Sequence, residues 1–178
     1  MLRRTLMDRV HGPLAGRISL RPAAVADEPL LYRIYASARG EELQLVNWDP
    51  GQKTAFLEMQ FGAQSAFYRQ CFPDSGYEVI LVNDEPVGRL FLHRDLDEIR
   101  LVDIGLLSEH RNRGIGAALI AAILDEAAEA GKPVRLHVEV SNRAQRLYQR
   151  LGFLPIGARN LHLEMEFVPN ISEKGCGL

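Results

Sequence analysis

Apolar residues recur every three or four positions in two stretches of the first half of the chain, a pattern typical of amphipathic helices. The first stretch follows Asp27, a candidate N-cap, and is expected to end at Gly40. The second begins at Asp49-Pro50, where a capping aspartate precedes a proline whose missing N–H has no helical partner to lose, and should run to about Cys71. The apolar positions are Leu30, Leu31, Ile34, Tyr35 and Ala38 in the first helix and Phe56, Met59, Ala63 and Phe67 in the second.

Runs of β-branched and aromatic residues predict strands in the rest of the chain. A short strand at residues 18–20 precedes Arg21-Pro22, and the near-continuous apolar run YEVILV forms another. The remaining elements are expected to be strands 87–93 and 99–107, a helix from about 114 to 130, a strand 134–140, a helix 144–151 and strands 153–158 and 161–168. Strand, helix and strand in succession imply a parallel, right-handed crossover. The pattern therefore predicts one mixed α/β domain.

Length and composition fit one ordinary globular domain of 178 residues, of which 47% are hydrophobic and 25% charged. We expect this domain at residues 17–168, with a loose N-terminal tail at 1–16 and a C-terminal tail at 169–178. Because the formal net charge is −2, no global positive field favours nucleic acid or acidic membranes as partners. No apolar run approaches the ~20 residues that span a bilayer, so a membrane is not expected either.

The two cysteines, Cys71 and Cys176, lie far apart in the sequence and suggest no disulfide framework. We therefore expect a reducing, cytoplasmic compartment. The N-terminal segment carries arginines but no apolar run after them, since Asp8 and Arg9 interrupt it. Organellar targeting is the alternative to a loose tail for this segment.

The strongest local signal is the sequence RNRGIG at residues 111–116, between a predicted strand and a predicted helix. Glycines there let the backbone approach a ligand, and the first N–H groups of the helix, together with its dipole, form an anion site suited to a phosphate or diphosphate. Two known motifs are excluded, because the loop lacks the Gly-Lys-Ser/Thr of a P-loop and has Leu119 where a dinucleotide fingerprint needs Gly or Ala. A tight strand-to-helix turn with solvated arginines is the alternative.

The sequence EHRNRGIG at residues 109–116 resembles the acetyl-CoA loop of the GNAT superfamily (Gcn-related N-acetyltransferases), whose pattern is R/Q-x-x-G-x-G/A. The resemblance implies a central mixed, mostly antiparallel sheet of six to seven strands, splayed between strands 4 and 5 and flanked by about four helices. It implies that backbone amides hold the diphosphate of acetyl-CoA at Arg111, Asn112, Arg113, Gly114, Ile115, Gly116 and Ala117. It also implies that pantetheine pairs with the splayed strand at Gly105, Leu106 and Leu107.

A second stretch carries the same resemblance in the C-terminal part of the chain. The segment LHVEVSN at residues 136–142, followed by Ala144, Leu147-Tyr148 and LGF at 151–153, is similar to the family's other cofactor segment. The resemblance implies that Asn142 contacts the cofactor and that Tyr148 lies near the thioester sulfur. A helix cap for Asn142 and a core position for Tyr148 are the structural alternatives.

Acetylation of an amine requires a base for the ammonium proton, a donor for the oxyanion and an acid for the leaving thiolate. The resemblance favours Tyr148 as the acid, and a main-chain N–H in 105–107 is the candidate oxyanion donor. Relatives often place the base at positions matching Arg100 or Val102, and neither residue can serve. We rank Glu139 first as the base, followed by Asp103 and Glu98, with relay through water as an alternative.

The predicted function is therefore transfer of acetyl from acetyl-CoA to a primary amine by direct attack in a ternary complex. The acceptor, a small molecule or a peptide, is not identified, although Glu41, Glu42 and Trp48 are candidates for its pocket. The five scattered histidines suggest no metal set, so no metal is expected. The alternatives are a non-catalytic acyl-CoA sensor or interaction module, or transfer of another acyl group. GNAT-like domains frequently form homodimers.

Overall fold

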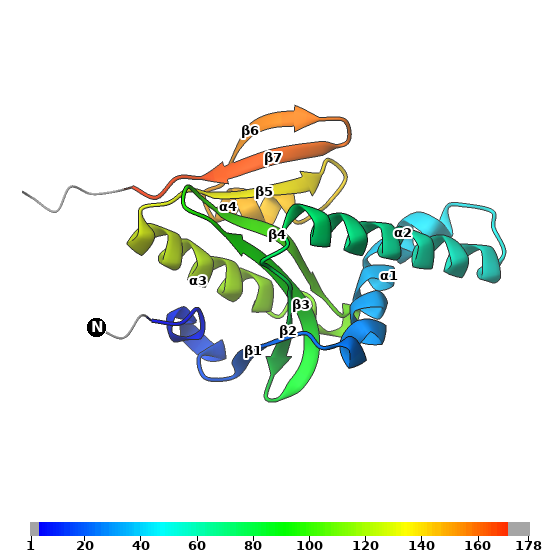
Figure 1. Ribbon diagram of the computed structural model, residues 1–178, viewed down its shortest axis with the longest axis horizontal. Helices are drawn as coiled ribbons and strands as arrows, with labels where there is room; N and C mark the ends of the chain where they lie inside the picture. Colours follow the sequence, from blue (N-terminus) through cyan, green and yellow to red (C-terminus); the bar gives the residue numbers. More distant parts are fainter. Residues whose placement is uncertain (1–3, 171–178) are drawn as a thin grey trace, which may run out of the picture. The chain divides into compact units, whose positions relative to one another are not determined.

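The computed structural model describes residues 4–170, and it confirms a mixed α/β fold with a seven-stranded sheet in the order β1-β2-β3-β4-β5-β7-β6 (Figure 1). Neighbouring strands pair antiparallel in β1–β2, β2–β3, β5–β7 and β6–β7, whereas β4 and β5 are parallel. The strands are β1 Ile18–Pro22, β2 Tyr77–Val82, β3 Glu85–Arg94, β4 Ile99–Leu106, β5 Val134–Glu139, β6 Leu154–Arg159 and β7 His162–Phe167. The four α-helices are α1 Glu28–Gln44, α2 Pro50–Cys71, α3 Ile115–Ala130 and α4 Gln145–Arg150.

The parallel ladder between β4 and β5 is short. It pairs Ile99–Leu101 with Val134–Leu136, whereas β5 pairs with β7 over all six of its residues. The hydrogen-bonded pairing of β4 with β5 thus ends halfway along β5, as the predicted splay between the fourth and fifth strands requires.

The chain divides into two compact units, and β3 and β4 each contribute to both. One unit contains the N-terminal residues up to Ala15, His93–Val102 and the chain from Ala117 onward. The other contains Gly16–Leu92 and Asp103–Gly116. Each unit has buried apolar residues of its own.

In the unit that starts at Gly16, helices α1 and α2 bury Leu31, Tyr35 and Phe61 in one cluster. In the other unit, α3 buries Leu119, Ile123 and Ala127, while β5 turns Val134, Leu136 and Val138 inward. Ile115, Leu119, Ile123 and Ala127 recur every four residues along this helix, and all four are buried.

Helix α2 begins where the sequence predicts. The Asp49 carboxylate accepts a hydrogen bond from the Gln52 N–H, and the Gln52 side chain accepts one from the Asp49 N–H, which completes a capping box. The predicted apolar face of α2 is wrong in part, because Met59 and Phe67 are about 60% exposed. The buried residue of the helix is Phe61, which packs against α1.

Helix α1 differs from the prediction at both ends. It continues past Gly40 to Gln44, since an isolated glycine costs a helix only about 1 kcal/mol and does not have to end it. Asp27 does not cap α1, because its carboxylate accepts from the Ala24 N–H in the preceding turn and pairs with Arg21 at 2.6 Å.

The N-terminal segment packs more closely than the predicted loose tail. Two short 3₁₀ helices occupy Met7–Arg9 and Gly12–Leu14, and Arg9 and Val10 are both about 95% buried. The guanidinium of Arg9 pairs with Glu129 on α3 at 2.5 Å. This ion pair is the physical reason for the difference, since it attaches the segment to a helix of the same unit.

Candidate active site

The predicted anion loop joins β4 to α3 through a turn with two left-handed residues. A 3₁₀ turn occupies Ser108–His110, and Asn112 and Gly114 follow with φ of 59° and 80°. Asparagine tolerates this conformation better than most residues, and glycine has no side chain to oppose it. Helix α3 then begins at Ile115 and continues for 16 residues.

The loop presents main-chain donors. Among the hydrogen bonds of residues 4–170, none has the N–H of Asn112, Arg113, Gly114 or Ile115 as its donor. These amides precede or begin a four-turn helix, so the partial positive charge of the helix N-terminus adds to them. An added Cβ at Gly116 would meet no heavy atom within 4 Å, which leaves space at the first turn. The arrangement fits a phosphate-bearing ligand.

The two arginines of the loop have different surroundings. Arg111 donates from Nε to the Leu106 carbonyl at 3.1 Å and from Nη2 to the Ser37 hydroxyl at 2.6 Å. Its guanidinium therefore fastens the loop to the end of β4 and to α1. Arg113 is exposed and is the cation that remains for an anionic ligand.

The end of β4 lies very close to β3 and α1. A Cβ added at Gly88 would approach the Gly105 carbonyl oxygen at 2.6 Å, and one added at Gly105 would approach Ile34 at 2.8 Å. Sequence reasoning missed Gly88, because its signal depends on the pairing of two strands. The Leu107 N–H donates to the Val87 carbonyl and is therefore not available to pantetheine, which leaves Gly105 and Leu106 as the candidates of this segment.

Tyr148 lies on α4, where its side chain is about 93% buried and its ring meets Phe153 edge-on at 5.7 Å. Asn142 does not cap α4, whose N-cap is Ala144. Its Oδ1 instead accepts the Ala144 N–H at 2.8 Å and fixes the turn before the helix. Glu139, Asn142 and Tyr148 share one compact unit, whereas Asp103 and the residues from Gly105 to Gly116 belong to the other.

Glu139, the first-ranked base, has a histidine neighbour on the adjacent strand. Glu139 and His162 are direct register partners on β5 and β7, and their side chains lie 3.9 Å apart, Oε1 to Nε2. Sequence reasoning missed His162 because only the β5–β7 register brings it to Glu139. Together the two side chains are able to take a proton from an amine substrate, which is what a general base does.

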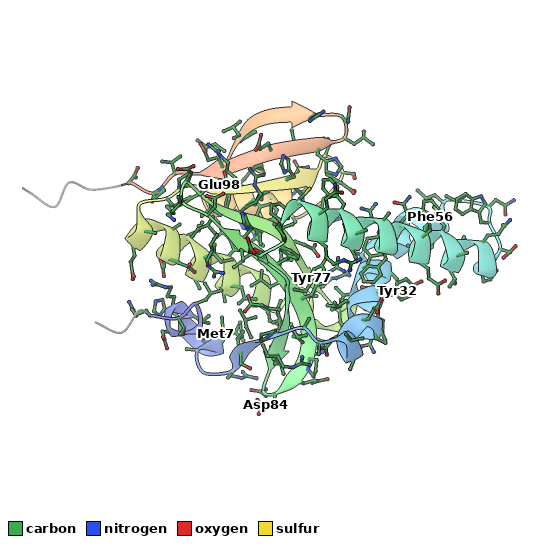
Figure 2. The ribbon with its side chains drawn as sticks, viewed as in Figure 1. Met7, Tyr32, Phe56, Tyr77, Asp84 and Glu98 are labelled. Carbon is green, nitrogen blue, oxygen red and sulfur yellow. The ribbon has the colours of Figure 1, made fainter. Side chains whose placement is uncertain are left out.

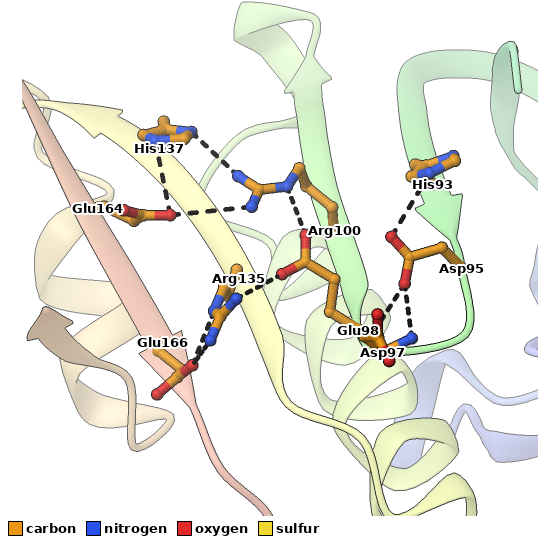
Figure 3. Close-up of polar contacts among 9 residues, drawn as sticks. All are labelled: His93, Asp95, Asp97, Glu98, Arg100, Arg135, His137, Glu164 and Glu166. Carbon is orange, nitrogen blue, oxygen red and sulfur yellow. Dashed lines mark hydrogen bonds and ion pairs between the residues drawn. The ribbon is translucent and has the colours of Figure 1, made fainter. Parts of the chain in front are cut away.

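Glu98, the third-ranked base, has a different role. Its carboxylate accepts from Arg100 at 2.6 Å and from Arg135 at 2.9 Å, and Figure 3 shows it held between these two guanidinium groups. The network continues on β5 and β7, where Arg135 pairs with Glu166 at 2.7 Å and His137 lies 3.8 Å from Glu164. Glu98 is therefore fixed at the centre of an ion network, with each of its carboxylate oxygens held by an arginine. Burial lowers the pKa of His137, which favours its neutral form.

Asp103, the second-ranked base, pairs with a buried arginine. Arg89 is about 96% buried on β3, and its Nε lies 2.7 Å from Asp103 Oδ2 on β4. Arg89 also donates to the Leu31 carbonyl and lies over the rings of Tyr35 and Tyr77. Burial raises the pKa of Asp103 despite this cation, and the side chain keeps 19% exposure.

The candidate acceptor segment lies at the end of α1 and the start of α2. Trp48 is 40% exposed and meets Phe56 edge-on at 5.2 Å. The side chains of Glu41 and Glu42, like Cys176, lie outside the described part of the protein.

No helix within residues 4–170 combines the length and apolar character that crossing a membrane requires. No group of three or more His, Cys, Asp or Glu side chains in this range is placed to hold a metal ion.

Comparisons with known proteins identify the family and the fold. Residues 38–153 match the model of the acetyltransferase (GNAT) family. The fold is similar to the PaiA N-acetyltransferase from Thermoplasma acidophilum in complex with coenzyme A, with a TM-score of 0.64 and 15% identity over 85% of this chain and 98% of that one. It is also similar to the ribosomal-protein-S18-alanine N-acetyltransferase from Escherichia coli, with a TM-score of 0.60 and 20% identity over 90% and 99%.

A third similar structure is RimL, a ribosomal L7/L12 alpha-N-protein acetyltransferase in complex with coenzyme A, with a TM-score of 0.57 and 16% identity over 88% of this chain and 97% of that one. No curated protein sequence matches the chain.

Proposed function

Since the chain belongs to the acetyltransferase (GNAT) family, we propose that it transfers the acetyl group of acetyl-CoA to a primary amine by direct attack in a ternary complex. The proposal depends on the main-chain N–H groups of Asn112 to Ile115 at the start of α3, which donate no hydrogen bond within the described residues. We assign residues 17–168 to the catalytic domain. The acceptor class is an amine of a small molecule or a peptide, and two of the similar structures are enzymes that acetylate ribosomal proteins.

The cofactor contacts follow from the loop. The amides of Asn112, Arg113, Gly114 and Ile115 bind the diphosphate, with Gly116 and Ala117 forming the wall of the first turn. Arg111 acts indirectly, by fixing the loop to Leu106 and Ser37. Gly105 and Leu106 pair with pantetheine, and Asn142 is assigned a cofactor contact of its own. Acetyl-CoA supplies an activated acyl group whose carbonyl carbon the amine attacks.

The proton transfers are assigned to two groups. Glu139, backed by His162, accepts one proton from the ammonium and so frees the amine to attack, and Asp103 is the second candidate for this base. As the C–N bond forms and the C–S bond breaks, Tyr148 donates its phenolic proton to the leaving thiolate, and the second proton that the nitrogen loses on becoming an amide returns to the Tyr148 oxygen. No covalent enzyme intermediate is required.

The test is incubation of the pure protein with acetyl-CoA and panels of amines, with thiol release followed by absorbance. We expect saturable release that depends on one class of amine. Failure of acetyl-CoA to bind by calorimetry would overturn the proposal. Binding without transfer to any amine would favour the non-catalytic sensor, and faster transfer from another thioester would identify a different acyl group.

Tyr148→Phe tests the general acid. Because the ring against Phe153 is retained, acetyl-CoA affinity and melting temperature should change little. Loss of the hydroxyl should lower kcat by roughly 100-fold, the lower end of what a general acid contributes. Steady-state kinetics and calorimetry on the same preparation measure both effects. An unchanged kcat would remove Tyr148 from the reaction.

A further inference from the structure

A pocket of about 490 Å³ lies between the start of α1 and the middle of α2, within one compact unit. This volume is in the range of small-molecule sites. Figure 2 labels Tyr32, one of the lining residues, which belongs to α1. We refer to this cavity as the α1–α2 pocket. It is lined by Val25, Ala26, Glu28, Pro29, Tyr32, Glu58, Phe61 and Gly62.

The pocket has two carboxylates without a cationic partner. Glu28 on α1 and Glu58 on α2 form no ion pair or hydrogen bond with any residue of the described chain. The arginines nearest along the sequence are already paired, Arg21 with Asp27 at 2.6 Å and Arg33 with Glu109 at 3.7 Å. The pocket therefore carries two negative charges that attract a cation.

The start of α1 acts against a cation, since a helix N-terminus has a partial positive charge. Glu28 lies in the first turn of α1 and offsets this charge. Glu58 is in the interior of α2, away from either end of that helix, and its charge is not compensated in this way.

The rest of the lining is aromatic and apolar. Tyr32 and Phe61 meet edge-on at 5.8 Å, and Phe61 is buried beneath the pocket. Burial and the nearby charge of Glu58 raise the pKa of the Tyr32 hydroxyl, which keeps its proton. Val25 is 89% exposed at the rim, and a Cβ at Gly62 would meet nothing within 4 Å. Aromatic and aliphatic surfaces suit the stem of an organic cation, whereas Ca²⁺ or Mg²⁺ needs about six oxygen ligands.

We propose that the α1–α2 pocket binds an alkylammonium ion, with the ammonium group between Glu28 and Glu58 and the aliphatic stem against Phe61 and Val25. The pocket is a binding site in its own right, and its occupation does not require acetyl-CoA. Failure of the proposed acetyl transfer would therefore leave this inference standing.

The probe is 1,6-diaminohexane, titrated into the full chain by calorimetry without acetyl-CoA. We expect saturable binding that weakens as salt increases. Glu58→Gln should reduce the affinity about tenfold, because a charge-assisted hydrogen bond is lost, and the Glu28→Gln/Glu58→Gln double variant should reduce it further. Glu85→Gln is the matched control, since it removes the same charge from an exposed position on β3 outside the pocket.

The comparison compound is hexane-1,6-diol, which has the same chain length and no charge. Weak or absent binding of the diol supports the proposal. Binding of the diol as tight as that of the diamine would overturn it, as would diamine binding that Glu58→Gln and Glu85→Gln reduce equally. Melting temperatures of the variants, which should equal that of the wild type, exclude loss of fold as the cause.

Discussion

Replacing Asp103 by leucine should lower the free energy of unfolding by about 3 kcal/mol, because it leaves the charge of Arg89 buried and unpaired. Arginine cannot lose its proton in a protein, so the buried charge persists. Removing one partner of a buried ion pair typically costs about 3–5 kcal/mol. We expect the lower end of that range, since the Asp103 side chain is 19% exposed and Arg89 keeps its hydrogen bond to the Leu31 carbonyl.

Arg89→Met is the complementary variant and should respond to pH. Burial already raises the pKa of Asp103 above its ordinary value in the wild type, and losing the cation raises it further. A carboxyl whose pKa is higher in the folded state than in the unfolded state binds its proton on folding. Stability therefore falls as pH rises from the unfolded pKa of about 3.9 through the folded pKa. The deficit of Arg89→Met should be larger at pH 8 than at pH 5.

Urea unfolding at pH 5 and pH 8 measures both effects. The Asp103→Leu variant has no carboxyl at this position and should not show this fall with pH, so its deficit relative to the wild type should be smaller at pH 8 than at pH 5. The Arg89→Met/Asp103→Leu double variant should be more stable than Asp103→Leu alone, since neither charge remains buried. Additive losses in the double variant would show that Arg89 and Asp103 stabilise the fold independently.

The elements of the fold follow from local sequence signals where those signals do not compete. Asp49 and Pro50 begin α2 as predicted, because a cap and a proline act within one turn of the helix. The predicted helix end at Gly40 was wrong, because the packing of α1 outweighs the low helix propensity of a single glycine. The predicted buried face of α2 was wrong at Met59 and Phe67, which are exposed, since apolar spacing does not say which face of a helix meets the core.

The same distinction between local and long-range signals decides which parts of the candidate site could be predicted from the sequence. The loop was predictable because the left-handed Asn112 and Gly114 and the helix start are neighbours in the chain. The partners of Asp103 and Glu139 were not, because Arg89 and His162 reach them only through the pairing of strands. Period-two patterns specify a strand and its faces but not the register of its neighbour.

Gly116→Leu should leave the fold intact and lower the affinity for acetyl-CoA by at least roughly 100-fold, which is about 2.7 kcal/mol. A Cβ added at this position meets no heavy atom within 4 Å, and leucine favours a helix more than glycine does. The melting temperature should therefore stay the same or rise slightly. In the proposed complex the same side chain enters the space of the diphosphate and displaces it from the amides of Gly114 and Ile115, each a charge-assisted hydrogen bond of about 1.5–3 kcal/mol.

Gly116→Ala is the matched control, because the proposed family pattern accepts alanine at this position and a methyl group is small. It should gain about 1 kcal/mol of stability from helix propensity and keep most of the affinity for acetyl-CoA. Calorimetry with acetyl-CoA and thermal unfolding without it separate the two effects. If Gly116→Leu bound acetyl-CoA as tightly as Gly116→Ala, the diphosphate could not lie at the start of α3, and the assignment of the loop amides would fall with it.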